Sequence, residues 1–549
     1  MSRNGQSTSI WMSVSNPRHP ALTNDVFADV CVIGGGIAGM TTAYLLVQEG
    51  RSVVLIDDGP VASGQTERTT AHLSNAIDAR YFEIERLHGE EGARLTAESH
   101  SAAIDCIESI VAQESIDCGF ERVDGYLFLA PEHSTDLLEK ELAAAHRAGL
   151  TQVEKLDRAD FDKFETGPCL RFPRQGQFHP LQYLSAVAEA IVRKGGRIFS
   201  DTKATEITGG KPARVRTAAG STVTCEAVVV ATNTPINDRV AIHTKQAPYR
   251  TYVITAKVPA RSVPNALFWD THDPYHYIRL FRSGGGQGSQ ENESGFDTII
   301  IGGEDHKTGQ NHEPEECFGR LEDWARERFP ITGHVEHCWS GQVWETVDGL
   351  GFIGRNPMDS DNVYISTGDC GMGMTHGTIA GMLLTDLIQG RDNVWSTLYD
   401  PTRKNIKAAM EYAKENTNVA WQYTDWLTPG EVSSAGEVAP GHGAIMRCGL
   451  SKVAVYRDDS SSVCELSAVC THLGGIVQWN SAEHTWDCPV HGSRFEARGR
   501  VVTGPANSDL APHEHPQPDA APPREQQQYQ PPFDRHREGP ETARDRSGQ

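Results

Sequence analysis

The stretch from Asp29 to Asp57 constrains the fold of this chain more than any other. It reads DVCVIGGGIAGMTTAYLLVQEGRSVVLID: an apolar run, then Gly34-x-Gly36-x-x-Gly39, a helix-forming segment and a second apolar run. Such glycines allow a tight turn and a close backbone approach to a pyrophosphate, which the free N–H groups of a helix N-terminus stabilise. Asp57 stands about 20 residues further on, where an acidic side chain accepts the ribose hydroxyls. The pattern predicts a dinucleotide site in an α/β domain; a tight strand–helix turn of another α/β domain is the alternative.

Charge and cysteine usage exclude several classes of partner and compartment. The net charge of −23 over 549 residues argues against nucleic acid and anionic membranes as partners. No apolar run approaches the length of a membrane span, and the first 25 residues lack the pattern of a secretory signal. The twelve cysteines are scattered, many of them in apolar contexts such as Cys31 and Cys225. We therefore expect reduced thiols and a cytoplasmic protein.

Three further segments follow the dinucleotide unit in a fixed order. They are a small, polar loop at 63–72 (SGQTERTTAH), an apolar strand at 226–231 (EAVVVA) that ends in Thr232-Asn233, and a strand at 362–367 (NVYIST) that leads into a second glycine loop, GDCGMGM, at 368–374. A helix is predicted over 378–388. The second strand–glycine–helix unit could also be an ordinary capped turn.

Taken together, these segments resemble the D-amino acid oxidase and glycine oxidase superfamily of FAD enzymes, over roughly residues 28–400. The resemblance implies FAD as the dinucleotide and hydride abstraction from a C–N bond as the chemistry. It also implies a set of FAD contacts: Gly34, Gly36, Gly39, Asp57, Ser63, Thr69, Thr70, His72, Gly371, Gly373, Met374 and Thr375. Some relatives tether FAD covalently through a histidine in a Thr-x-His setting, so a covalent link through His72 is a further hypothesis.

A second motif lies near the other end of the chain. Cys470-x-His472 is followed, after fifteen residues, by Cys488-x-x-His491. This resembles the Rieske [2Fe–2S] motif, in which two thiolates hold one iron and two imidazoles hold the other. A structural Cys2His2 zinc site is the alternative, but zinc fingers usually pair cysteine with cysteine, whereas each pair here is mixed. We therefore predict a [2Fe–2S] cluster on these four residues.

The motif departs from the Rieske proteins of cytochrome bc complexes in one respect. Those proteins carry an extra cysteine in each loop, and the two form a disulfide; Gly475 and Val490 stand in these places here. Ser493 keeps a hydroxyl near the cluster, and Phe495 stands where high-potential members have a tyrosine. Fewer hydrogen bonds to the sulfurs are expected to lower the reduction potential.

The predicted fold class is α/β, a Rossmann-like FAD-binding domain with an α+β substrate domain, plus a small all-β Rieske domain. The expected boundaries are 28–80, 171–245 and 341–400 for the FAD-binding domain, 81–170 and 246–340 for the substrate domain, 401–427 for a helical linker, 428–510 for the Rieske domain and 511–549 for a disordered tail. The linker contains a predicted helix over 406–413.

Candidate catalytic residues fall in the segment YHYIR of the substrate domain. Arg279 could clamp a carboxylate, and His276 or Tyr277 could orient an amine. A half-buried strand with one polar face explains the same pattern. The segment GEDH at 303–306 is interpreted as a loop with solvated charges rather than as a metal site.

The sequence thus predicts an FAD-dependent oxidoreductase that oxidises a small amine or amino acid and passes electrons through the cluster to an unidentified acceptor. One rival is a Rieske oxygenase, which needs a mononuclear iron on two histidines and a carboxylate; the sequence offers no convincing triad. The other rival is a non-catalytic redox sensor whose cluster reports to a partner.

The glycine motif generates a direct test. Replacing Gly36 with valine should place a branched side chain in the space of the pyrophosphate, and the purified protein should lack FAD. The absorbance of flavin released on denaturation measures the occupancy. A Gly36→Val variant that purifies yellow at full occupancy would contradict the assignment.

Overall fold

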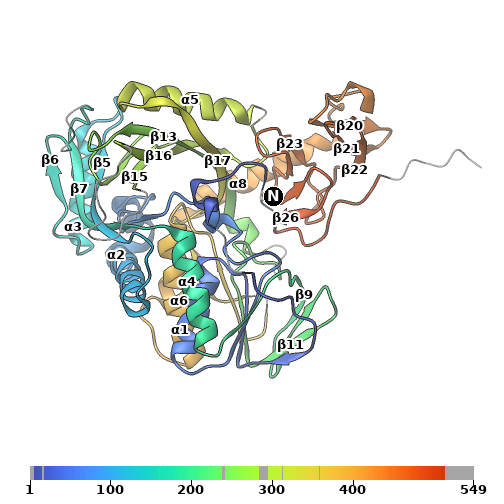
Figure 1. Cartoon of the computed structure of the whole chain (residues 1–549), viewed down its shortest axis with the longest axis horizontal. Helices are drawn as coiled ribbons and strands as arrows, with labels where there is room; N and C mark the ends of the chain where they lie inside the picture. The colour runs from blue at the N-terminus through green and yellow to red at the C-terminus, as the bar shows by residue number, and fades with distance from the viewer. Residues whose placement is uncertain are drawn as a thin grey trace, which may run out of the picture. The chain divides into compact units, whose positions relative to one another are not determined.

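A six-stranded sheet frames the dinucleotide-binding part of the chain (Figure 1), in the order β18–β19–β12–β2–β3–β8. Its strands are β2 (Val30–Ile33), β3 (Val53–Ile56), β8 (Arg197–Phe199), β12 (Ala227–Val230), β18 (Phe352–Arg355) and β19 (Val363–Thr367). All but β18 run parallel. Every residue of β2, β3 and β12 is buried, as expected of strands covered on both faces. The carboxyl ends of the parallel strands therefore meet at one edge, where ligands bind in such folds.

The computed structural model describes residues 5–513 with short gaps, at 15–17, 160, 162–163, 238–240, 283–294, 312 and 358. Residues 1–512 form one unit by their contacts. The predicted disordered tail lies outside the described residues from 514 onward. Its first residues pair with the preceding domain, since Ser467 N–H donates to the Ala511 carbonyl at 2.8 Å.

Helices cover one face of the six-stranded sheet and a small sheet covers the other (Figure 1). The helices α1 (Ile37–Gln48), α4 (Pro180–Arg193) and α6 (Gly373–Gln389) pack with Val30 and Val32 of β2. The alternate side chains, Cys31 and Ile33, pack against the small sheet. That sheet consists of β1 (Val26–Phe27), β9 (Ala204–Thr208), β10 (Ala213–Thr217) and β11 (Thr222–Cys225).

A larger, mainly antiparallel sheet forms the substrate part, in the order β17–β13–β16–β15–β14–β5–β7–β4. Its strands are β4 (His72–Leu73), β5 (Glu121–Phe128), β7 (Cys169–Gln177), β13 (Gln246–Pro259), β14 (Leu267–Asp270), β15 (Tyr277–Phe281), β16 (Phe296–Lys307) and β17 (Thr332–Thr346), with β6 (Glu154–Leu156) beside β7. Strands β7 and β17 continue past the boundaries predicted at 171 and 341, because each pairs with its neighbour along its length. The helices of this part are α2 (Tyr81–Glu114, interrupted at Gly89), α3 (Thr135–Arg147) and α5 (Pro314–Arg328).

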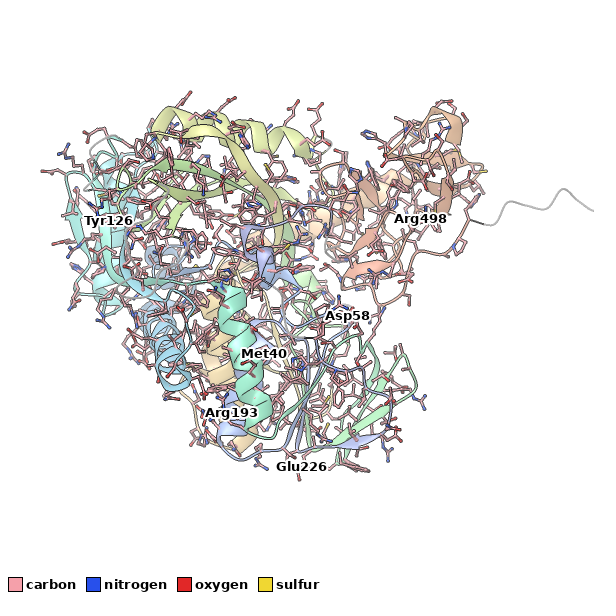
Figure 2. All side chains as sticks on the ribbon, viewed as in Figure 1. Met40, Asp58, Tyr126, Arg193, Glu226 and Arg498 are labelled. Atoms are coloured by element: carbon pink, nitrogen blue, oxygen red, sulfur yellow. The ribbon has the colours of Figure 1, made fainter. Side chains whose placement is uncertain are left out.

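The C-terminal β domain, residues 428–512, has two small antiparallel sheets. The first holds β20 (Gly443–Cys448), β21 (Ser451–Arg457) and β22 (Val463–Ser467). The second holds β23 (Gln478–Asn480), β24 (Thr485–Asp487), β25 (Arg494–Glu496) and β26 (Val501–Thr503). Figure 2 labels Met40 in the dinucleotide-binding part, Tyr126 in the substrate part and Arg498 in the C-terminal β domain.

The linker carries a longer helix than its sequence suggests. After the short α7 (Ser396–Tyr399), α8 spans Ala409–Gln422, where the sequence predicts 406–413. Glu415 of α8 pairs with Lys307 of β16 at 2.5 Å. Beyond α8, Tyr423 Oη donates to the Leu473 carbonyl at 2.8 Å and Trp426 Nε1 to the Gly474 carbonyl at 3.0 Å. The linker is thus fixed to the substrate sheet and to the C-terminal β domain, which makes it a spacer of defined length.

A buried ion group joins the C-terminal β domain to the rest of the protein. The Glu483 side chain is 1% exposed, and its Oε1 lies 3.2 Å from Arg68 Nη1 and 3.4 Å from Arg250 Nη2. It also accepts from Ser340 N–H at 3.2 Å. Burial would raise the pKa of Glu483, but Arg68, Arg250 and Arg494 outweigh it and hold this pKa at about 2. We call these four charged residues the Glu483 ion group.

Substituting Glu483 should weaken the attachment of the C-terminal β domain to the rest of the protein. A Glu483→Gln variant keeps the shape of the side chain but leaves buried arginines without a countercharge, which costs about 3–5 kcal/mol. We expect a lower unfolding midpoint in calorimetry and faster proteolysis between residues 423 and 442. Glu437→Gln, in an exposed part of the same domain, is the control. Equal midpoints and equal proteolysis rates in the two variants would show that the ion group does not hold the domain in place.

Candidate active site and cluster site

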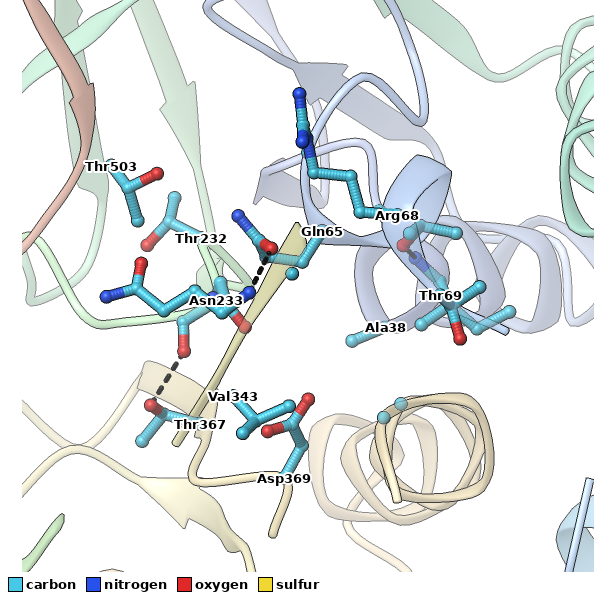
Figure 3. A pocket seen from close by; sticks show the side chains of 18 of the residues that line it. Ala38, Gln65, Arg68, Thr69, Thr232, Asn233, Val343, Thr367, Asp369 and Thr503 are labelled. Carbon is cyan, nitrogen blue, oxygen red and sulfur yellow. Dashed lines mark hydrogen bonds between the residues drawn. The ribbon is translucent and has the colours of Figure 1, made fainter. Parts of the chain in front are cut away.

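A cavity of about 340 Å³ opens at the carboxyl edge of the six-stranded sheet (Figure 3). It is lined by the first glycine loop, Asp57, the loop at 63–72, the end of β12 and the second glycine loop. Its volume is that of a small-molecule site. Figure 3 also shows Thr503, of the C-terminal β domain, among the side chains around this cavity.

The first glycine loop has the geometry of a pyrophosphate cradle. Gly34 adopts a positive φ of 107°, and Gly36 is the N-cap of α1. A Cβ on Gly39 would lie 1.9 Å from the Gly34 carbonyl oxygen, so only glycine lets the helix pack this closely. Asp57 Oδ2 accepts from Gly35 N–H at 2.6 Å, and its side chain lines the cavity. Gly34, Gly36 and Asp57 therefore fit FAD directly, whereas Gly39 shapes the turn from behind.

The loop at 63–72 contributes the predicted side chains Ser63, Thr69, Thr70 and His72 to the cavity wall. Both ring nitrogens of His72 are engaged, Nδ1 with Thr70 Oγ1 at 3.0 Å and Nε2 with the Ile278 carbonyl at 3.2 Å. Burial and nearby Arg279 lower the pKa of His72 to about 3. A covalent link to FAD would require His72 to give up one of these hydrogen bonds, so this arrangement does not favour the covalent hypothesis.

The second glycine loop reaches the cavity through Gly371, Gly373 and Met374. Thr375 does not line the cavity. Its Oγ1 is buried, 2.9 Å from His100 Nδ1, and it donates to the Met372 carbonyl at 3.2 Å. Thr375 therefore positions the start of α6, and the prediction that it contacts FAD does not fit its place.

Of the three candidate catalytic residues, the structure brings Tyr277 alone to the cavity wall, with its Oη 2.5 Å from Thr251 Oγ1. His276 is buried elsewhere: its Nδ1 lies 2.8 Å from Asp270 Oδ2, and its ring stacks on Trp324 at 4.0 Å. Arg279 is also outside the cavity.

The Arg279 guanidinium donates to three backbone carbonyls, those of Thr70, Ala71 and Phe178, at 2.8 to 3.2 Å. It thus braces the loop at 63–72. Tyr277 and Arg279 lie on the same face of β15, but the Arg279 guanidinium is taken up by these backbone carbonyls and does not line the cavity. The prediction that Arg279 clamps a substrate carboxylate does not fit this placement.

Sequence reasoning missed four carboxyl groups that line the cavity, those of Asp78, Asp305, Glu345 and Asp369. Asp305 was expected in a solvated loop, but it belongs to β16. Asp369 could have been found, since it stands inside the second glycine loop. Asp78 and Glu345 carry no local signal, because only the tertiary fold brings them to this place.

The predicted cluster ligands lie in two tight loops of the C-terminal β domain. Cys470 and Cys488 are 3% and 2% exposed. The two thiols share a hydrogen bond, which, with backbone N–H groups and Ser493, lowers the pKa of Cys470 to about 7. The rings of His472 and His491 lie 5.1 Å apart at 82°. Two sulfurs and two imidazoles thus converge, as a Rieske cluster requires.

Two observations test whether a cluster fits these loops. His491 Nδ1 is buried and has no hydrogen-bond partner among the described residues, as expected of a nitrogen that binds metal. The ligands are also sorted by kind, since the Cys470 thiol pairs with that of Cys488 and the His472 ring with that of His491. A zinc site needs four ligands around one ion, whereas one iron of a Rieske cluster takes two thiolates and the other two imidazoles. This pairing therefore favours the [2Fe–2S] cluster over zinc.

Gly475 and Val490, which stand where a disulfide joins the loops of other Rieske proteins, lie side by side. A Cβ on Gly475 would be 2.4 Å from Val490 Cγ2 and 3.1 Å from Cys488 Sγ. Van der Waals packing therefore closes the two loops here. Ser493 and Phe495 are both fully buried in the same region.

These sites define a class: a flavoprotein oxidoreductase with an iron–sulfur domain on the same chain. The family model for FAD dependent oxidoreductases (DAO) matches residues 29–387, and the model for the Rieske [2Fe-2S] domain matches residues 428–514. The chain belongs to the DAO family of FAD dependent oxidoreductases and carries a C-terminal Rieske domain. It is an oxidoreductase with FAD and a [2Fe–2S] cluster as its cofactors, and the predicted fold class is confirmed.

Known proteins are similar to the chain in whole or in part. It is 32% identical over 502 residues to the Rieske 2Fe-2S iron-sulfur protein YhfW of Bacillus subtilis (strain 168), covering 91% of this chain and 96% of YhfW. It is 27% identical over 391 residues to gamma-glutamylputrescine oxidoreductase of Escherichia coli (strain K12), covering 67% of this chain and 85% of that protein. The crystal structure of glycine oxidase from Geobacillus kaustophilus shares the fold, with a TM-score of 0.58, 18% identity and coverage of 69% and 99%. None of the described helices is both long and apolar enough to cross a membrane.

Loss of one cluster ligand should remove the cluster without removing FAD. A Cys470→Ser or His491→Ala variant should lose the cluster, since each iron depends on two protein ligands, but should retain FAD. Electron paramagnetic resonance of the reduced protein and the flavin absorbance measure the two contents. Cys448→Ser, an exposed cysteine of the same domain, is the control and should keep both. Retention of the Rieske signal in either ligand variant would refute the ligand assignment.

Proposed function

We propose that this enzyme oxidises a C–N bond of a small amine or amino acid and passes the electrons from FAD to the Rieske cluster and on to an acceptor. FAD supplies the two-electron chemistry and the cluster takes electrons singly. The protein supplies the binding, the orientation and the distance between the two. The Escherichia coli relative is named for an amine, gamma-glutamylputrescine, which supports this class of substrate.

One observation carries the proposal: the Rieske domain forms part of the wall of the FAD cavity. Residues 500–504, 506 and 507 line it together with the glycine loops. Asn507 Nδ2 donates to the Ile236 carbonyl at 2.6 Å, at the loop that follows β12. The Rieske domain thus borders the FAD cavity, and electron transfer between the two cofactors needs such proximity.

Direct contacts continue from that wall to the ligands of the cluster. The Oγ1 atom of Thr234, in the loop after β12, lies 3.4 Å from His243 Nδ1. The His243 ring packs against those of His472 and His491, at 5.0 and 6.4 Å between centroids. A buried histidine of the FAD-binding part therefore packs edge-on against His472 and lies near His491.

The cluster loops are also packed tightly on the substrate sheet. Gln342 of β17 donates through Nε2 to the Gly492 carbonyl at 2.8 Å, and a Cβ on Gly492 would lie 2.3 Å from Pro248 Cβ. A domain that swings between donor and acceptor would have to break these contacts and the Glu483 ion group. A fixed relay is therefore the simpler arrangement.

This geometry supports the two rival functions, a Rieske oxygenase and a redox sensor, less well than it supports the relay. An oxygenase needs two histidines and a carboxylate around one iron, and the described residues bring no such three groups together. A sensor would not need a substrate-sized cavity that the Rieske domain helps to line.

Rapid mixing of the anaerobic holoenzyme with a substrate found by flavin bleaching tests the relay. The flavin band should bleach first, and the paramagnetic signal of the reduced cluster should follow. In a His491→Ala variant the flavin should still bleach, but turnover with a one-electron acceptor should fall steeply. If the wild-type cluster stays oxidised through many turnovers, the relay is wrong. If no amine or amino acid bleaches the flavin, while cluster reduction changes binding to a partner, the sensor hypothesis is favoured.

A further inference from the structure

Besides Asp57 and Asp58, a group of four acids lines the cavity. Its four carboxyl groups come from four separate segments: Asp78 before α2, Asp305 on β16, Glu345 on β17 and Asp369 in the second glycine loop. Figure 3 shows the Asp369 side chain among those that surround the cavity. These segments are far apart in the sequence, so the fold itself gathers the acids at one place.

Neighbouring groups satisfy these acids only in part. Asp78 Oδ2 accepts from Tyr275 Oη at 2.7 Å, and Asp369 Oδ1 accepts from Trp344 N–H at 3.2 Å. Asp305 Oδ1, however, is buried with no hydrogen-bond partner among the described residues. Because an unsatisfied buried acceptor is costly, a ligand that donates a hydrogen bond to this oxygen would be favoured here.

No cation of the described cavity wall stands beside these acids. The cationic residues that line the cavity are Arg68, Lys203 and Arg500. Arg68 belongs to the Glu483 ion group, and Arg500 pairs with Glu496 and interacts with Asp58. Lys203 follows Thr202, whose N–H donates to the Asp57 carbonyl. Lys203 therefore lies near Asp57, at the dinucleotide-binding end of the cavity.

Several of these carboxyl groups raise the pKa of a neighbour. Burial raises the pKa of Asp305 to about 7 and that of Asp78 and Asp369 to about 6. The Asp78 carboxylate contributes to the rise at Asp305 and at Asp369, whereas the Tyr275 hydroxyl and Arg80 hold the pKa of Asp78 down. Burial and the three aspartates raise the pKa of Glu345 well above its usual range. A cation bound among them would restore their ionised form and remove the mutual repulsion.

We propose that the substrate is a small amine with a second cationic nitrogen and no carboxylate near the reacting carbon, a diamine or polyamine. This inference rests on the proposed function and names its substrate class. The second ammonium group binds between Asp305, Asp78 and Glu345, and Tyr275 and Tyr277 add aromatic rings to the same wall, which favour a cation. A carboxylate in this place would meet four acids, and the described cavity wall has no arginine beside them, since Arg80 acts on Asp78 from outside the wall.

The chemistry balances within this scheme. The carbon next to the reacting nitrogen gives up its C–H bond, a hydride goes to FAD, and the nitrogen loses a proton as the C=N bond forms. Water then hydrolyses the imine to an aldehyde and ammonia, or to an aldehyde and an amine where the reacting nitrogen is secondary. The two electrons leave by the route proposed above.

Three probes with the same four-carbon chain separate the charge requirements: 1,4-diaminobutane, 1-aminobutane and 4-aminobutanoate. Each is titrated anaerobically into the holoenzyme while the flavin band is followed, beside a panel of amino acids and spermidine. We expect the diamine or spermidine to bleach the flavin at a concentration at least ten-fold lower than 1-aminobutane, and 4-aminobutanoate to fail.

Variants then test the carboxyl groups. Asp305→Asn keeps the size of the side chain but removes its charge, and should raise the half-bleaching concentration of the diamine about ten-fold, the effect of losing about 1.4 kcal/mol. It should leave that of 1-aminobutane nearly unchanged. Glu304→Gln, a neighbour that pairs with Arg320 outside the cavity, is the matched control. The rise in unfolding midpoint on adding the diamine gives a readout independent of turnover, and it should shrink in Asp305→Asn alone.

The outcomes distinguish this inference from the proposed function. If amino acids bleach the flavin and the diamine and spermidine do not, the substrate class is wrong while C–N oxidation stands. Equal responses of Asp305→Asn and Glu304→Gln would likewise overturn the role of the acids. If no amine or amino acid bleaches the flavin, the proposed function fails and this inference fails with it.

Discussion

The arrangement of the whole protein depends on one buried carboxylate, that of Glu483. It belongs to the Rieske domain, yet its ion partners Arg68 and Arg250 come from the loop beside the FAD cavity and from β13 of the substrate sheet. Separating the domains would leave these charges buried without partners, which is far more costly than exposing an ordinary polar contact. The Glu483 ion group thus fixes the orientation of the domain as well as its attachment.

A fixed orientation explains why the FAD cavity is built from both domains. Residues 500–504, 506 and 507 complete its wall, and the loop that carries Cys488 and His491 packs on β13 and β17 through Gly492. The linker helix α8 adds a further brace through Glu415 and Lys307. Since distance governs whether electrons pass between two centres, these contacts are as much a part of the proposed relay as the cofactor ligands.

The two cofactor sites were predictable from sequence because each depends on a few residues within short segments. A glycine turn followed by a helix, or Cys-x-His near Cys-x-x-His, needs its residues at fixed spacing, and the structure places these residues where such chemistry needs them. The substrate wall was not predictable. The sequence predicts Arg279 as a carboxylate clamp, but carbonyls of distant segments, those of Thr70, Ala71 and Phe178, take up its guanidinium. It predicts Asp305 in a solvated loop, but Asp305 belongs to β16 and lines the cavity. Glu483 gave no signal, because its partners lie far away in the sequence.

Two groups of buried charge in this protein differ in a way that bears on function. Around Glu483, one carboxylate is surrounded by arginines and hydrogen-bond donors, so its charge is balanced within the protein. Around Asp305, four carboxyl groups face a cavity, and none of the cations of the described wall lies beside them. Burying like charges together is destabilising, and a fold bears that cost most readily where a ligand offsets it. The balanced group is therefore structural, and the unbalanced group marks where the positive charge of a substrate belongs.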